Sequence, residues 1–268
     1  MAPSRDTAAY TERVRALYDQ VSQDFEEFCS ATLQAGLVPH PELSGVPLPT
    51  ASNLRLAARA GIVDSEHWLD AGCGVGGPAV DLAGAFPALR IDAITLSPVQ
   101  AGMARERAAT AGVQDRVTVH EGDYHSLPFP DASFDGVWFF ESSGYAYDAP
   151  RLFSEVFRVL KPGGRLYIKD LFAKPGPYTD EEQTQLDGVD ALWAAALVPV
   201  REDWCALLSA AGLVDLEHQQ LTDATSHFYF GAMFDDDLTL NRFGQAFFKQ
   251  FPNPDLVHYG EVRGRRPE

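Results

Sequence analysis

Residues 68–78 read Trp-Leu-Asp-Ala-Gly-Cys-Gly-Val-Gly-Gly-Pro, a short apolar stretch that runs straight into a glycine-rich turn. Glycine has no Cβ atom, so such a turn lets the main chain approach a ligand closely. A helix that starts after the turn directs its free N–H groups at the same ligand. This stretch therefore predicts a strand, a ligand-binding turn and a helix, in that order.

The flanking segments repeat the alternation of strand and helix. Apolar runs typical of strands alternate with segments that have helical periodicity or helix-capping residues. We expect strands at 67–71, 90–96, 116–121, 134–140, 165–169, 213–221 and 256–263, and helices between them at 79–86, 98–111, 150–160 and 201–211. This order predicts an α/β fold, namely a Rossmann-like, seven-stranded, mostly parallel sheet with helices on both faces.

The start of the chain and its later part depart from this alternation. Residues 7–28 carry apolar side chains three and four positions apart, which predicts an amphipathic helix, and a second helix is expected from about 50 to 60. We therefore predict an N-terminal helical lid over 1–60 and an α/β core over 61–268. The predicted cap insertions within that core are residues 171–200 and 223–254.

The composition limits the partners and the compartment. The chain has 21 Lys and Arg against 38 Asp and Glu, a net charge of −17. Such a charge repels phosphate backbones and anionic lipid surfaces, which argues against nucleic acid and membrane partners. The three cysteines form no CxxC pair, as is usual for reduced cytoplasmic thiols. We expect a cytoplasmic protein that acts on a small-molecule substrate, and the sequence is compatible with a homo-oligomer.

Two kinds of ligand compete for the glycine-rich turn. Gly72, Gly74 and Gly77 fit the G-x-G-x-x-G pattern of dinucleotide-binding enzymes, which is weak evidence by itself. A nicotinamide enzyme needs an acidic residue at the end of its second strand, but residues 94–97 read Ile-Thr-Leu-Ser. Asp70 precedes the turn, where its charge suits a cationic ligand better than a pyrophosphate. An NAD-binding oxidoreductase is therefore a distant alternative.

Four ordered segments resemble class I S-adenosylmethionine-dependent methyltransferases over about residues 60–170. They are 70–76 (Asp-Ala-Gly-Cys-Gly-Val-Gly), 122–124 (Gly-Asp-Tyr), 127–135 (Leu-Pro-Phe-Pro-Asp-Ala-Ser-Phe-Asp) and 159–164 (Val-Leu-Lys-Pro-Gly-Gly). The resemblance implies S-adenosyl-L-methionine as cofactor, with Asp123 receiving the adenine amino group. The residues that it assigns to the cofactor are Tyr18, Asp70, Gly72, Cys73, Gly74, Thr95, Leu96, Ser97, Gln100, Gly122, Asp123, Tyr124 and Glu141.

Further features are similar to one group within that family. Residues 95–100 (Thr-Leu-Ser-Pro-Val-Gln) replace the usual acidic ribose ligand, as in tocopherol and sterol C-methyltransferases and cyclopropane fatty acid synthases. The resemblance assigns ribose binding to Ser97 or Gln100. Tyr18-Asp19-x-x-Ser22 is similar to the N-terminal motif of tocopherol-type enzymes, whose helix closes over the cofactor, and His40 to a histidine that follows it. Core packing explains Tyr18 equally well.

The acceptor side is expected beyond the fourth strand. Glu141 directly follows that strand, and ligands of parallel sheets bind at the carboxyl ends of strands. Sterol, tocopherol and geranyl diphosphate C-methyltransferases are similar here, so the resemblance implies that Glu141 stabilises a carbocation or removes a proton. Its alternative role is to bind the cofactor or the N-terminal helix. Tyr145 and His227 are the other catalytic candidates, although a structural role is commoner for such a histidine.

These observations imply methyl transfer to a small, apolar natural-product acceptor. C-methylation of an isoprenoid alkene through a carbocation is the first hypothesis, and the aromatic residues at 228–230 and 243–251 suit such an acceptor. O- or N-methylation of a small secondary metabolite is the alternative, because it needs little beyond alignment and at most one base. Mg²⁺ is expected only for a diphosphate acceptor, and the histidines show no metal-ligand spacing.

Overall fold

The computed structural model describes residues 7–29, 31–32, 34, 36, 38, 42–43, 45–196, 198–221 and 255–268. Two sequence predictions, the insertion at 223–254 with His227 and the position of His40, lie outside these residues. None of the described helices is long and apolar enough to cross a membrane.

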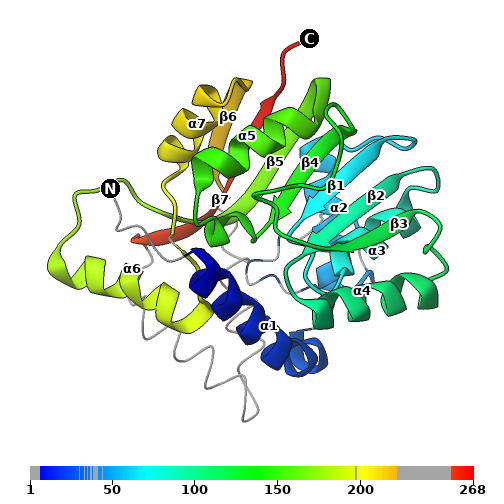
Figure 1. Ribbon diagram of the computed structural model, residues 1–268, viewed down its shortest axis with the longest axis horizontal. Helices are drawn as coiled ribbons and strands as arrows, with labels where there is room; N and C mark the ends of the chain where they lie inside the picture. Colours follow the sequence, from blue (N-terminus) through cyan, green and yellow to red (C-terminus); the bar gives the residue numbers. More distant parts are fainter. Residues whose placement is uncertain are drawn as a thin grey trace.

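Seven described strands form one central sheet in the order β3-β2-β1-β4-β5-β7-β6 (Figure 1). They are β1 (His67–Ala71), β2 (Arg90–Thr95), β3 (Val117–Glu121), β4 (Phe134–Phe140), β5 (Leu160–Ala173), β6 (Val214–Gln220) and β7 (Val257–Arg265). Strand β7 runs antiparallel to its neighbours β5 and β6, and the pairs from β3 to β5 are parallel. The predicted mostly parallel, seven-stranded sheet is confirmed. Because the strand order reverses between β2 and β4, a crevice is expected beside β1.

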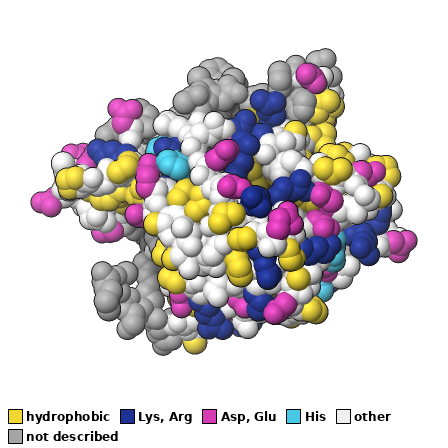
Figure 2. Space-filling view, turned by 90° about the horizontal axis from the view of Figure 1, so that it is seen from above, with side chains coloured by type: hydrophobic (Ala, Val, Ile, Leu, Met, Phe, Trp, Pro, Cys, Tyr) yellow, Lys and Arg dark blue, Asp and Glu magenta, His cyan; other side chains and the backbone are white. Residues whose placement is uncertain are grey.

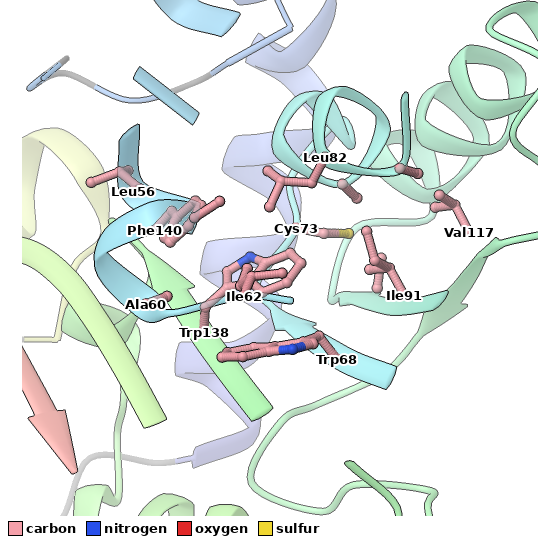
Figure 3. Close-up of a cluster of buried hydrophobic side chains, with 14 of the residues drawn as sticks. Leu56, Ala60, Ile62, Trp68, Cys73, Leu82, Ile91, Val117, Trp138 and Phe140 are labelled. Carbon is pink, nitrogen blue, oxygen red and sulfur yellow. The ribbon is translucent and has the colours of Figure 1, made fainter. Parts of the chain in front are cut away.

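Helices cover both faces of the sheet. One face carries α2 (Leu48–Ala60), α3 (Gly77–Ala85) and α4 (Pro98–Thr110), and the other carries α5 (Ala149–Val159) and α7 (Arg201–Ala210). On the first face Trp68 and Trp138 lie fully buried with Leu56 and Leu82 (Figure 3). Burying one such side chain contributes about 1.5–3 kcal/mol. The buried side chains between the sheet and its helices therefore hold the strands in place.

The N-terminal helices have different roles. Helix α1 (Thr7–Cys29) lies at one end of the sheet, as does α6 (Asp180–Trp193) (Figure 1). Helix α2 instead packs against α3, and its Leu56 and Ala57 are completely buried in the core. The apolar side of α2 thus completes a core layer while α1 lies over the strand ends, and the lid over 1–60 stays a prediction.

Strand β5 is much longer than predicted. The sequence predicts a strand at 165–169 after a turn at 161–164, but β5 extends from Leu160 to Ala173. Its residues 165–173 pair with β7 at every position. The predicted cap at 171–200 thus begins inside the sheet, because an antiparallel partner from the far end of the chain extends the strand.

The surface carries charges of both signs. Figure 2 shows Lys and Arg side chains interspersed with Asp and Glu on one face of the molecule. Partly exposed ion pairs include Arg165–Glu66, Arg265–Asp215 and Lys161–Asp135. Such pairs contribute about 0–1 kcal/mol each, so the fold depends on its core far more than on them.

Candidate functional site

A cavity opens at the carboxyl ends of β1, β2 and β4, with α1 across it. It encloses about 830 Å³ of empty space when its open mouth is included. The predicted site residues that line it are Tyr18, Asp70, Gly72, Cys73, Gly74, Thr95, Leu96, Ser97, Gln100, Gly122, Tyr124, Glu141 and Tyr145. The fold therefore brings together residues from position 18 to position 145, nearly half of the chain, at the crevice expected beside β1.

The glycine-rich turn is conformationally demanding. Its positive φ angles are 91° at Gly72, 53° at Gly74 and 82° at Gly76, in the region that favours glycine. A Cβ atom on Gly72 would lie 2.5 Å from the Cβ atom of Ser142. Ser142 in turn donates from Oγ to the Ala71 carbonyl at 2.6 Å, which ties the end of β4 to the end of β1. Close approach of these two strand ends thus requires the glycine.

Asp70 places a buried carboxylate in the cavity wall. The residue is 2% exposed, and its Oδ2 atom has no hydrogen-bond partner. Burial raises the pKa of Asp70 to about 7, and the indole of Trp138 offsets this effect in part. Burial also raises the pKa of the Cys73 thiol well above its ordinary value, so this thiol is neutral. An unpartnered carboxylate oxygen beside an open cavity suits a cationic ligand group.

The end of β2 is hydrogen-bonded to helix α1. Ser97 caps α4, because its Oγ accepts from the Gln100 N–H at 3.0 Å, and it also donates to the Asp19 carboxylate. Thr95 donates from Oγ1 to Gln100 Oε1 at 2.7 Å. The Ser97 hydroxyl is therefore occupied, and of the two predicted ribose ligands Gln100 has the side-chain N–H groups to offer. Asp19 fastens α1 to this edge of the cavity, a contact that the motif alone did not predict.

Asp123 does not line the cavity, although its neighbours Gly122 and Tyr124 do. Its Oδ1 accepts from the His125 N–H at 2.8 Å, and its Oδ2 accepts from the Tyr147 hydroxyl at 2.6 Å. Burial by itself raises the pKa of Asp123, but the hydrogen bonds from His125 and Tyr147 outweigh it and lower the pKa below the ordinary value. The carboxylate orders the loop after β3, and its contact with adenine stays a prediction.

Glu141 is held in a strained position at the end of β4. Its φ angle is 59°, which few residues other than glycine adopt. Its Oε1 accepts from the Gly36 N–H at 2.9 Å and forms an ion pair with Lys169. Lys169 lies in β5, is completely buried, and also donates to the Gly36 carbonyl. Glu141 Oε1 is thus held by both Gly36 and Lys169, which suits a fixed negative group better than a free base.

Tyr18 and Tyr145 meet where α1 crosses the cavity. Tyr145 ends the short 3-10 helix η1 (Ser143–Tyr145), and its hydroxyl is hydrogen-bonded to that of Tyr18. The two rings are edge to face, with centroids 5.7 Å apart. Burial raises the pKa of Tyr18 to about 12 and that of Tyr145 well above its ordinary value, so both phenols are protonated. Tyr18 therefore both packs against the protein and faces the cavity.

Asp170 organises the turn that carries Tyr145. Its Oδ2 accepts from the Ser143 N–H at 2.8 Å, the Ser143 hydroxyl at 2.7 Å and the Gly144 N–H at 3.2 Å. Burial raises the pKa of Asp170 to about 6, while the hydrogen bonds from Ser143 oppose this change. Sequence reasoning missed both Asp170 and Lys169. Lys169 and Asp170 are two adjacent charged residues at the carboxyl end of the predicted strand. The rule that identified Glu141, that such residues line the ligand crevice, could have identified them too.

The histidines that the structure describes lie apart from the described cavity wall. No histidine is among the residues that line it, and the described part of the chain holds no group of three His, Cys, Asp or Glu residues arranged for a metal ion. His67 and His120 instead bind the Asp92 carboxylate at 2.6 Å and 2.5 Å, away from the cavity. The third catalytic candidate, His227, is not among the described residues.

Comparison with known proteins agrees with this geometry. Residues 69–168 match the family model described as "Methyltransferase domain". The chain is 32% identical over 220 residues to the methyltransferase GfsG of Streptomyces halstedii, covering 81% of this chain and 78% of that protein. It is 36% identical over 162 residues to the 27-O-demethylrifamycin SV methyltransferase of Amycolatopsis mediterranei, covering 59% of this chain and 58% of that protein.

A solved structure supports the fold. Geranyl diphosphate C-methyltransferase from Streptomyces coelicolor, in complex with Mg²⁺, geranyl diphosphate and S-adenosyl-L-homocysteine, superposes with a TM-score of 0.79 at 22% identity. The superposition covers 98% of this chain and 100% of that one. With the likeness to GfsG over most of both proteins, these matches place the chain: it belongs to the class I S-adenosylmethionine-dependent methyltransferases.

Proposed function

We propose that this methyltransferase acts on a small, apolar natural-product acceptor, and that its reaction is C-methylation of an isoprenoid alkene. The observation that carries the proposal is the composition of the cavity wall. It combines a buried carboxylate with one unpartnered oxygen for the cofactor with protonated tyrosines and one ion-paired carboxylate on the acceptor side.

The cofactor half of the cavity fits S-adenosylmethionine. When bound, this cofactor supplies an electrophilic methyl group on a positively charged sulfur. Asp70 Oδ2 would bind the cationic methionine end, because that oxygen is buried without a partner. The turn at Gly72 and Gly74 would let the main chain approach the methionine end, and the amide of Gln100 would bind the ribose. The carboxylate of Asp70 thus matches the positive charge of the methionine end, and the amide of Gln100 matches the polar ribose.

The acceptor half suits an alkene. A methylated trisubstituted alkene becomes a tertiary carbocation, which is such a strong acid that a weak base can take its proton. A neutral alcohol needs a better base, and no histidine lines the described cavity wall. Tyr18, Tyr124 and Tyr145 line the cavity, and the face of an aromatic ring can stabilise a cation. We therefore assign the apolar, cation-tolerant part of the wall to an alkene acceptor.

Glu141 fits the role of cation stabiliser better than that of base. Its Oε1 atom is already bound by Lys169 and by the Gly36 N–H, so the carboxylate is fixed in orientation. A negative group fixed before the reaction stabilises developing positive charge without having to reorganise. We propose that Glu141 stabilises the carbocation and that the proton leaves to water or to a neighbouring oxygen.

Replacing Glu141 with Gln tests this role. Glutamine keeps the shape and one acceptor oxygen for Gly36, so we expect the Kd for S-adenosylhomocysteine to stay within about threefold. Turnover should fall by about 100-fold, because loss of one preorganised electrostatic group typically costs that much. Glu155→Gln on α5, outside the cavity, is the matched control and should keep full turnover. A fully active Glu141→Gln enzyme would remove Glu141 from the mechanism.

The acceptor is identified with a labelled methyl donor. The enzyme is incubated with methyl-labelled S-adenosylmethionine and a panel that contains geranyl diphosphate with Mg²⁺, an uncharged isoprenoid alkene and a hydroxylated polyketide. Mass spectrometry of the products locates the label. Label on an alkene carbon supports the proposal, whereas label confined to an oxygen would replace it with O-methylation.

O-methylation of a secondary metabolite is the second candidate. Its support is the 36% identity to a methyltransferase named for 27-O-demethylrifamycin SV, together with the occupied state of Glu141. In that case turnover would be insensitive to Glu141→Gln, and alignment of the hydroxyl with the cofactor would supply most of the rate.

A further inference from the structure

Lys169 carries a charge that is completely buried. It lies near the carboxyl end of β5 with no exposed surface. Its ammonium group donates to Glu141 Oε1 and to the Gly36 carbonyl, and it lies 3.5 Å from Gln34 Oε1. It also lies 4.7 Å from the centroid of the Tyr259 ring. A buried ammonium is costly unless several groups satisfy it, so these contacts need an explanation beyond simple packing.

Gly36 is held at both of its main-chain groups by the same ion pair. Its N–H donates to Glu141 and its carbonyl accepts from Lys169. A Cβ atom on Gly36 would lie 2.6 Å from carbon atoms of the Tyr259 ring, so the main chain rests on that ring. The ion pair Glu141–Lys169 therefore binds the main chain at Gly36, a position where only glycine fits.

Other contacts hold the same stretch from the outside. We call the described residues between 31 and 38, namely 31, 32, 34, 36 and 38, the cover segment. Asn53 of α2 binds the side chains of Thr32 at 2.9 Å and Gln34 at 3.0 Å. The Val38 N–H donates to Ser52 Oγ at 2.9 Å. The cover segment is thus fixed between α2 on one side and the ion pair on the other.

The cover segment also forms part of the cofactor side of the cavity. Ala31 and Gln34 line the cavity together with the glycine-rich turn. A Cβ atom on Gly77 would lie 2.1 Å from the Ala31 carbonyl oxygen, so the segment lies directly on the start of α3. Displacing Gly36 would therefore move the wall that faces the methionine end of the cofactor.

We propose that Lys169 is a positioning residue for the cofactor, because it ties the cover segment to Glu141 across the cavity. The proposal rests on the assignment of this cavity to S-adenosylmethionine. It separates two functions of Glu141: its bond to Gly36 serves cofactor binding, and its charge serves the acceptor. Lys169 acts only through these groups and touches neither the reacting carbon nor the methyl group.

The test compares Glu141→Gln with the double variant Glu141→Gln/Lys169→Met. Glu141→Gln is the reference because it keeps an acceptor for the Gly36 N–H and leaves no unpaired carboxylate once Lys169 is replaced. The double variant then lacks the ammonium group that donates to the Gly36 carbonyl and also contacts Gln34 and the Tyr259 ring. We expect its Kd for S-adenosylhomocysteine, measured by calorimetry, to be about 10-fold weaker than that of the reference. The KM for S-adenosylmethionine should rise by a similar factor, with kcat within about twofold of the reference.

Two further measurements make the result specific. Lys161→Met removes the partly exposed lysine of the Lys161–Asp135 pair, also in β5, and should leave cofactor affinity unchanged. Gly36→Ala leaves the ion pair intact but introduces the clash with Tyr259, so it should weaken cofactor binding by at least the same factor. Hydrogen exchange of the cover segment should quicken in both affected variants and not in the Lys161 control.

The outcomes are distinct from those of the proposed reaction. Equal affinities of the reference and the double variant would overturn the role of Lys169, whatever the acceptor is. Unchanged affinity in Gly36→Ala would overturn the role of the cover segment. If the wild-type protein bound no S-adenosylhomocysteine, the cofactor site itself would fall and this inference with it. A kcat lowered equally in the reference and in the double variant, with the loss of affinity confined to the double variant, supports the separate roles of Lys169 and Glu141.

Discussion

Replacing Gly74 with valine should abolish measurable binding of S-adenosylhomocysteine, with the Kd weakened by more than about 100-fold. Gly74 lines the cavity with a φ of 53°, a conformation that a β-branched residue adopts only at considerable cost. The valine side chain would also have to occupy space at the turn that is open for the ligand. The first effect distorts the turn before the ligand binds, and the second blocks the ligand directly. Isothermal titration calorimetry of the purified variant measures the resulting loss of affinity.

The control is a glycine in the next helix. A Cβ atom on Gly84 in α3 would meet no atom within 4 Å, so Gly84→Ala should keep wild-type affinity. It should also gain up to about 1 kcal/mol of stability, because alanine favours a helix interior over glycine. Titration of the wild type with NADH should give no heat of binding. Binding of NADH alone, or normal affinity in Gly74→Val, would contradict the placement of the cofactor.

Asp70→Asn should weaken S-adenosylhomocysteine binding by about 10- to 100-fold, since a charge-assisted hydrogen bond is worth about 1.5–3 kcal/mol. The cofactor-free variant should nevertheless be more stable than the wild type at pH 8. In the wild type the carboxylate is buried with one oxygen unpartnered, and asparagine removes the cost of burying that charge. A loss of affinity together with a rise in melting temperature would show that Asp70 serves ligand binding at the expense of stability.

The raised pKa of Asp70 also makes cofactor binding depend on pH. The pKa of the carboxyl is about 7 in the cofactor-free protein against 3.8 for the ordinary group. A cation favours the ionised form, so below pH 7 binding must release a proton. The affinity should therefore fall as the pH falls below about 7, by up to about tenfold per unit, and level off above it.

The same shift has the opposite sign for the stability of the cofactor-free protein. Between about pH 4 and pH 7 the folded protein retains a proton that the unfolded chain releases, so its free energy of unfolding falls as the pH rises. Asp70→Asn should flatten both profiles, whereas Asp135→Asn, at the opposite end of β4, should leave the affinity profile unchanged. An affinity that does not change between pH 5.5 and pH 8 in the wild type would show that Asp70 does not face the cation.

Local sequence was sufficient for the parallel strands β1 to β4, whereas β5 was predicted too short. The strand at 67–71 and the glycine turn after it are correctly predicted, as is the strand at 134–140. Each is defined within a few residues by apolar runs and by glycines that must take positive φ angles. The same local rule placed Glu141 and Tyr145 at the cavity, because a polar residue that follows a buried parallel strand emerges at its carboxyl end.

What the sequence by itself determined was therefore the alternating α/β order, the cofactor class and most of the residues around the cavity. Only the tertiary structure decided that α2 belongs to the core, that β7 lies between β5 and β6, and that Glu141 is paired with Lys169 over Gly36. These arrangements depend on contacts between residues far apart in the chain, whose energies come from shared burial and charge neutralisation. A lysine at the end of a strand looks the same in sequence whether it faces solvent or an ion pair, and packing decides between the two.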